Sequence, residues 1–181
     1  RVEKKMAISR PICNIGFKDQ QVGSGGDELL KRDITTNMLI DILFGKSSEL
    51  YQELYETGII GDNFSASYTG EPGYGMTVLG GHTDQTEDFY NSIIRGIKSK
   101  RGNINSEEVE RIRKKMIGDY ISTFDSLRSI GQNFVSYYFN NMDIFHELNM
   151  INEITLADLE ERFEEHFSLD NHAISIVKPQ K

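Results

Sequence analysis

The chain has no tryptophan, a single cysteine and three prolines. Because Cys13 stands alone, no internal disulfide can form, and its apolar neighbours predict a buried, inert thiol. One cysteine also suits a reducing compartment, so we expect a cytoplasmic location, with any targeting signal upstream of Arg1. No apolar run approaches the ~20 residues that span a bilayer. The net charge of −8 argues against nucleic acid as a partner.

Apolar periodicity predicts one α+β domain over residues 1–181. Period-two alternation predicts a first strand at 11–17, a hairpin of 63–69 and 74–80 around a turn at 70–73, and a closing strand at 173–177. Helical periodicity predicts helices at 28–44, 48–57, 84–97, 107–121, 126–138, 144–148 and 155–167. Since helices and strands are segregated along the chain, we expect an antiparallel sheet with helices packed on one face.

Helix ends and apolar stripes are also predicted. Asp27, Thr83 and Ser106 are expected as N-caps, and Gly45 is expected to end the helix before it. The helix at 126–138 carries a stripe of Leu127, Ile130, Phe134 and Tyr138. The aromatic run at 137–139, and Tyr68 and Tyr74 beside the hairpin turn, are expected to pack in the core. Contact with a peptide is the alternative for these aromatic residues.

Residues Met38–Tyr68 read MLIDILFGKSSELYQELYETGIIGDNFSASY. This segment resembles the non-catalytic half-domains of the pitrilysin/insulinase family of zinc metallopeptidases, in which a similar glycine-flanked helix precedes a strand. The resemblance covers nearly the whole chain and is also strong at Asn152–Val177. It implies an α+β half-domain that forms the C-terminal half of a longer chain similar to bacterial processing proteases.

The zinc-binding signature of that family, His-x-x-Glu-His, is absent. The nearest match is Arg162-Phe163-Glu164-Glu165-His166, where an arginine, which cannot ligate zinc, stands at the first histidine. We therefore expect His166 to be an ordinary residue in the last turn of a helix, where positive charge is favourable. The other histidines, at 82, 146 and 172, are isolated in sequence. No metal ligand and no catalytic residue is predicted, and zinc is expected only in the parent protein.

Two further segments resemble known functional motifs. Gly45-Lys46-Ser47 imitates the end of a phosphate-binding loop, but the required earlier glycine falls at Ile40 inside a helix, so no nucleotide site is predicted. Many family members hold the substrate with an arginine and a tyrosine seven residues apart. Aligned on this chain, the two positions are Tyr55 and Asp62, and neither keeps the chemistry. No substrate-binding residue is therefore assigned.

The resemblance implies a substrate-chamber domain of a zinc-dependent peptidase that is inert alone. Its expected partners are its own N-terminal half-domain or a homologous subunit, and a peptide substrate. Two alternatives stay open: a non-catalytic scaffold subunit similar to core proteins, and a free-standing peptide-binding module. An isolated half-domain is expected to expose an apolar docking patch.

Overall fold

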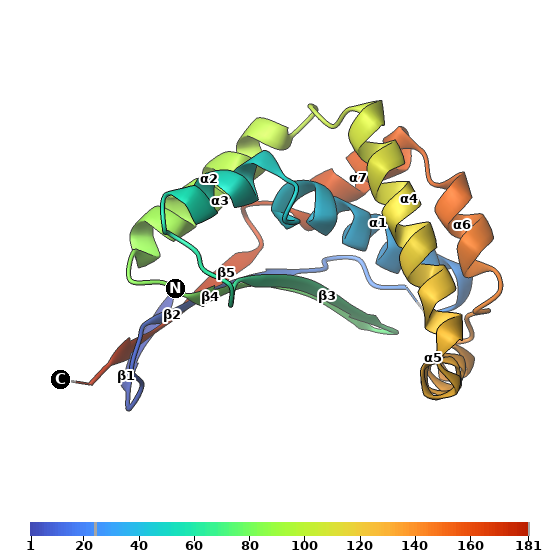
Figure 1. Cartoon of the computed structure of the whole chain (residues 1–181), viewed down its shortest axis with the longest axis horizontal. Helices are drawn as coiled ribbons and strands as arrows, with labels where there is room; N and C mark the ends of the chain where they lie inside the picture. Colours follow the sequence, from blue (N-terminus) through green and yellow to red (C-terminus); the bar gives the residue numbers. More distant parts are fainter. Residues whose placement is uncertain (24, 181) are drawn as a thin grey trace.

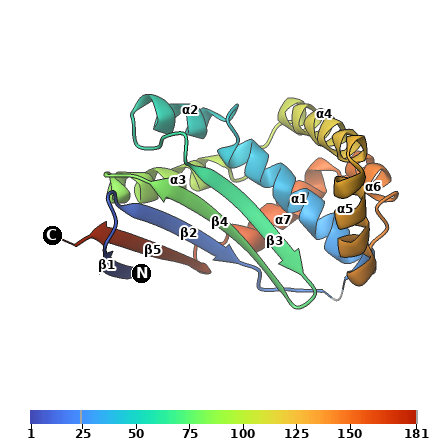
Figure 2. The ribbon, with the colours of Figure 1, turned by 60° about the horizontal axis from the view of Figure 1, so that its bottom comes forward.

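One curved sheet carries helices on one face, and its other face is uncovered (Figure 1). The computed structural model describes residues 1–23 and 25–180. The strand order is β1-β5-β2-β4-β3 (Figure 2), and every pair is antiparallel except β1 with β5. The strands are β1 (Val2–Met6), β2 (Ile12–Lys18), β3 (Ser65–Glu71), β4 (Tyr74–His82) and β5 (His172–Pro179). The predicted α+β fold with helices on one face is confirmed.

The sequence pattern missed strand β1. Its five residues, VEKKM, are all exposed, so the strand has no buried face to create an apolar alternation. The strand predicted as the first is therefore the second, and the sheet is mixed rather than purely antiparallel, because β1 pairs parallel with β5 at the edge.

The helices above the sheet follow the predicted order. They are α1 (Gly26–Phe44), α2 (Glu49–Glu56), α3 (Thr86–Lys100), α4 (Ser106–Ser122), the 3-10 turn η1 (Thr123–Asp125), α5 (Leu127–Phe139), α6 (Glu147–Glu153) and α7 (Leu156–His166). Gly45 ends α1 as predicted. The short helix predicted at 144–148 lies later, at α6, because the residues before it form a turn.

All three predicted N-caps are wrong. Helix α1 begins one residue before Asp27, and α3 begins three residues after Thr83, whose hydroxyl instead accepts a hydrogen bond from the backbone N–H of Gln85. Helix α4 is capped by Asn105 rather than Ser106. The Asn105 amide oxygen accepts from the N–H of Glu108, whose carboxylate accepts from the N–H of Asn105 in return.

The hydrophobic core lies between the sheet and the helices. Cys13, Ile15 and Phe17 of β2 point toward the helices and are fully buried. The Phe17 ring meets Phe167 edge to face at 5.3 Å between centroids, which joins the sheet to the end of α7. Cys13 is buried, as predicted, and burial raises the pKa of its thiol to about 11.

A buried polar network connects the same layers. It is centred on Asp19, which directly follows β2 and has no exposed side-chain surface. Its Oδ1 accepts hydrogen bonds from Arg162 Nη2 at 2.6 Å and from His166 Nδ1 at 2.5 Å, both on α7. Its Oδ2 accepts from the Tyr68 hydroxyl of β3 at 2.6 Å. Arg32 of α1 adds a second cation 3.7 Å from Oδ2.

These partners hold the carboxylate in its ionised form. Burial alone raises the pKa of Asp19, but the hydrogen bonds from His166 and Tyr68 and the charge of Arg162 outweigh burial and place the pKa well below its ordinary value. Arg162 Nε also donates to the Thr36 hydroxyl at 2.7 Å, so the guanidinium bridges α7 to α1. The network therefore ties α1 and α7 to β3 and to the end of β2.

A second acidic side chain near this network lies in surroundings that favour its protonated form. Asp33 of α1 has a buried Oδ1 with no hydrogen-bond partner among the described residues. A Cβ at Gly70 of β3 would collide with that oxygen, so the glycine leaves room for it. Burial, supported by the nearby charge of Glu71, raises the pKa of Asp33 to about 7.

Replacing Asp19 with alanine is predicted to destabilise the domain strongly. The change leaves the buried guanidinium of Arg162 without its counter-ion, which costs about 3–5 kcal/mol in the free energy of unfolding. Urea unfolding at pH 7 measures the loss. As a control, Asp62→Ala removes an exposed aspartate and is expected to change stability by less than about 0.5 kcal/mol. Equal effects of the two changes would contradict the role given to Asp19.

Replacing Asp33 with asparagine is predicted to remove a pH dependence. The folded protein keeps the Asp33 proton up to about pH 7, whereas the unfolded chain releases it near pH ~4. The folded state therefore binds more protons between these values, and the wild type loses stability as pH rises. We expect Asp33→Asn to gain about 1–2 kcal/mol relative to wild type between pH 5 and pH 8, because the carboxyl is only partly desolvated. Parallel stability curves for the two proteins would refute this.

Candidate functional site

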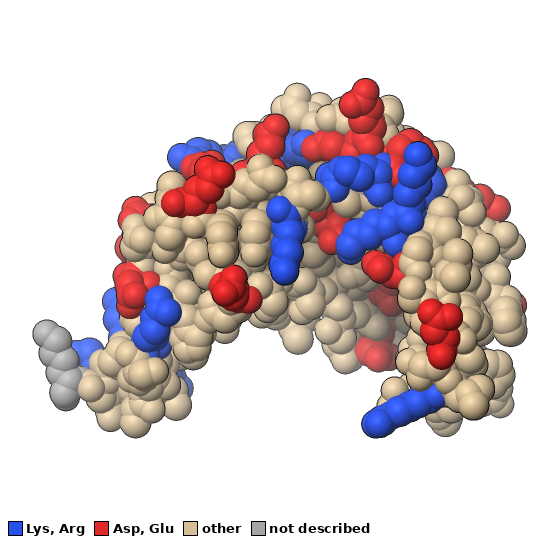
Figure 3. Space-filling model, viewed as in Figure 1, with Lys and Arg blue, Asp and Glu red and all other residues tan. Residues whose placement is uncertain are grey.

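The uncovered face of the sheet is the candidate site. On β4, Thr77 and Leu79 point into the core, so the alternation places Tyr74, Met76 and Val78 on the open face. These three side chains are between 38% and 45% exposed. Figure 3 shows the concave underside in profile, between the two ends of the molecule.

Small residues hollow out the middle of this face. Gly16 of β2 lies opposite Ala173 of β5 and Val78 of β4 in the sheet register. Two adjoining hollows of about 470 and 390 Å³ share Gly16 and Ala173 in their linings. We call this joined depression the trough. Its lining also includes Val2, Lys4, Asn14, Lys18, Tyr74, Met76, Asn171 and Ser175.

The nearest match to the zinc signature lies on the other side of the sheet. Arg162 and His166 are one helical turn apart on α7 and both point into the Asp19 network. Burial lowers the pKa of His166 more than its hydrogen bond to Asp19 raises it, so the imidazole is neutral at pH 7. Its Nδ1–H donates to Asp19, and its Nε2 accepts from the Thr77 hydroxyl at 2.6 Å.

This arrangement does not fit zinc. Both imidazole nitrogens of His166 take part in hydrogen bonds, and the guanidinium of Arg162 lies next to the ring. No group of three or more His, Cys, Asp or Glu side chains that could hold a metal occurs in residues 1–23 and 25–180. The expectation that His166 carries a helpful positive charge at the helix end is wrong, because the residue is fully buried.

The two positions of the substrate clamp lie together on the surface. Tyr55 at the end of α2 places its hydroxyl 3.5 Å from Asp62 Oδ1, and both residues are exposed. The pair presents a hydroxyl and a carboxylate. A carboxylate repels developing negative charge and cannot stabilise an oxyanion.

The aromatic run on α5 is not in the core. Tyr138 and Phe139 are 70% and 76% exposed, and only Tyr137 is half-buried. Of the predicted stripe on this helix, Leu127 and Phe134 are exposed too. The alternation of β3 does bury most of Tyr68, as predicted, but Tyr74 lies on the open face. Periodicity identified apolar faces correctly without showing what covers them.

The fold of this chain, a sheet with helices packed on one face, recurs in known proteins. The description "peptidase M16 inactive domain" belongs to the family model that matches residues 2–116. The uncharacterized zinc protease YmfH of Bacillus subtilis (strain 168) is 33% identical over 178 residues, which are 98% of this chain and 42% of that protein. No helix in the described part of the chain is long and apolar enough to cross a membrane.

Solved structures agree with this assignment. An M16-like peptidase of Alicyclobacillus acidocaldarius superposes with a TM-score of 0.93 at 27% identity, over 98% of this chain and 43% of that one. A protease from Helicobacter pylori shares the fold, with a TM-score of 0.80 at 19% identity over 98% and 43% of the two chains. This chain thus spans less than half the length of these relatives. It belongs to the peptidase M16 family, the pitrilysin/insulinase family of the resemblance, as an inactive domain.

Proposed function

We propose that this domain forms one wall of a peptide chamber in a zinc peptidase whose metal site lies in a companion half-domain. The observation that carries this proposal is the trough on the only sheet face that the described helices leave open. We use the name companion half for the part of the relatives that this chain does not span.

The lining of the trough suits unfolded peptides. Gly16, Ala173 and Ser175 leave space for side chains of a peptide, and Met76 is a flexible apolar side chain that adapts to different partners. The charged residues Lys4 and Lys18 lie in the linings of separate hollows rather than together. Such a wall selects peptides by size and shape more than by charge.

The domain contributes contacts and exclusion of water rather than chemistry. The Tyr55–Asp62 pair supplies no cation and no oxyanion donor. In the whole peptidase, groups that hold the reacting carbonyl therefore come from another half-domain or from a homologous subunit, as in members of the family that divide these tasks between two chains. The isolated domain is inert.

The same altered clamp favours a second candidate, a scaffold subunit of a complex without peptidase activity. A scaffold requires the fold and its docking surfaces but no open route to the trough. The two candidates differ in whether filling the trough changes peptide cleavage.

Filling the trough with Gly16→Leu is predicted to reduce peptide cleavage by the full-length protein. A Cβ at Gly16 meets no heavy atom closer than 3.8 Å, so the new side chain extends over the open face without strain in the core. We expect kcat/KM for an unfolded peptide of ten to twenty residues to fall about tenfold, with unchanged zinc content and unchanged melting temperature.

Gly118→Leu is the matched control, because Gly118 lies exposed on α4 with nothing within 4 Å of an added Cβ. It should cleave as the wild type does. Cleavage by Gly16→Leu at the wild-type rate would remove the trough from the substrate path. No cleavage by the zinc-loaded wild type would favour the scaffold.

A further inference from the structure

Helix α5 exposes an apolar face that no described part of the chain covers. None of its thirteen residues is buried, although most large side chains on it are apolar or aromatic. The exposed members are Leu127 (89%), Phe134 (53%), Val135 (52%), Tyr138 (70%) and Phe139 (76%). Exposed patches of this kind on otherwise well-packed proteins mark interaction sites.

Few contacts anchor the helix to the domain. The Tyr137 hydroxyl donates to Glu147 Oε2 at 2.7 Å, and the N–H of Gly26 donates to the carbonyl of Asn140 at 2.8 Å. A helix in water draws most of its stability from packing of its apolar face. The face of α5 is therefore incomplete in this domain alone.

The composition of α5 favours a protein as its partner. Arg128 is the single charged residue in LRSIGQNFVSYYF. Helices that bind membrane surfaces carry several lysines and arginines on their polar face. Aromatic residues, by contrast, are enriched at the centre of protein–protein interfaces.

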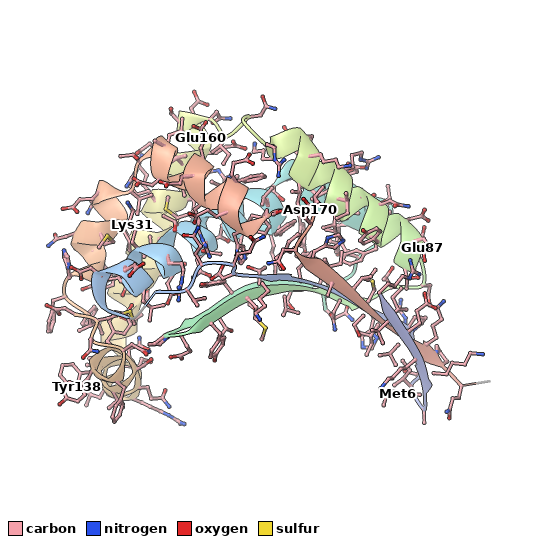
Figure 4. All side chains as sticks on the ribbon, turned by 180° about the vertical axis from the view of Figure 1, so that it is seen from behind. Met6, Lys31, Glu87, Tyr138, Glu160 and Asp170 are labelled. Atoms are coloured by element: carbon pink, nitrogen blue, oxygen red, sulfur yellow. The ribbon has the colours of Figure 1, made fainter. Side chains whose placement is uncertain are left out.

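The position of α5 indicates which protein. The molecule is an arch: α5 forms one end and β1 the other, as the labelled Tyr138 and Met6 show in Figure 4. Val2 and Met6 of β1 are also exposed. A peptide in the trough would lie between these ends, whereas a body of similar size to the domain could rest on both and enclose the trough.

We propose that α5, through Phe134, Tyr138 and Phe139, is the docking face for the companion half. The length of the relatives supports this occupant, because more than half of each lies outside the part that this chain matches. This inference rests on the proposed function, which supplies a companion half, and it adds the surface that binds it. When the companion half is bound to this face, it closes one end of the chamber and leaves the trough free for a peptide.

The test uses the full-length protein and its two halves expressed separately. Hydrogen exchange of the α5 amides should be fast in this domain alone and at least about tenfold slower in the full-length protein and after addition of the companion half. Tyr138→Ser together with Phe139→Ser should weaken binding of the companion half about tenfold or more in calorimetry. Because both side chains are exposed, the melting temperature of the isolated domain should not change.

Tyr55→Ser is the matched control, since it removes another exposed tyrosine from a helix on a different part of the surface. It should bind the companion half as the wild type does. Unchanged α5 exchange and unchanged affinity of the double variant would overturn the inference. So would a dimer of this domain that the double variant abolishes and the companion half does not displace, because a second copy would then be the occupant.

The two proposals fail in different ways. If the companion half docks through α5 but Gly16→Leu cleaves peptides normally, the trough assignment fails and the docking face stands. If the double variant keeps full affinity while Gly16→Leu loses cleavage, the chamber stands and the docking face is elsewhere.

Discussion

The packing of the helices on the sheet depends on one set of contacts, those that the buried partners make with the ionised carboxylate of Asp19. A buried charge is costly unless cations and hydrogen-bond donors surround it. Here the donors come from α7 and β3, and a second cation comes from α1. The carboxylate is stable only when these elements are in place together, so it fixes how α7 lies across the sheet. If any one donor is removed, the remaining partners no longer fully offset the cost of burying the Asp19 charge.

These anchoring contacts all lie on one face of the sheet, which explains why the helices cover that face and leave the other open. Polar and apolar anchors both point to the same side of β2 and β4, with Thr77 bound to His166 and Leu79 in the core. The alternate residues of these strands are left for the opposite face, where a glycine and an alanine make a depression. The alternation of side chains along β2 and β4 thus produces both the face that the helices cover and the face that carries the trough.

Local pattern was enough to predict most of the fold. The hairpin and the helix ended by Gly45 depend on residues within a few positions of one another. Strand β1 could not be predicted, because a fully exposed edge strand carries no apolar signal. Nor could the Asp19 network, whose partners on α7 are 143 and 147 residues away. The trough needed the register of three strands, which no single segment contains.

Helix α5 shows a different limit. The apolar stripe predicted for this helix is real, but the described domain does not cover it, and the aromatic run at 137–139 that is expected in the core is mostly exposed. Periodicity reports that a face avoids water and says nothing about which chain supplies the cover. This chain spans less than half of its relatives, and the uncovered stripe agrees with the docking face proposed for a companion half.

Arg162 and His166 occupy the first and last positions of the nearest match to the zinc signature, but they bind a carboxylate instead of a metal ion. Side chains one turn apart on a helix converge on a common point, which can be a metal ion or a carboxylate. On α7 that point is Asp19 Oδ1. The arginine, which would exclude zinc, is here the counter-ion that makes the buried aspartate tolerable. A metal ligand placed at position 162 would therefore remove a cation that stabilises the buried Asp19 carboxylate. The surface that remains free for function is the one without these groups, on the opposite face of the sheet.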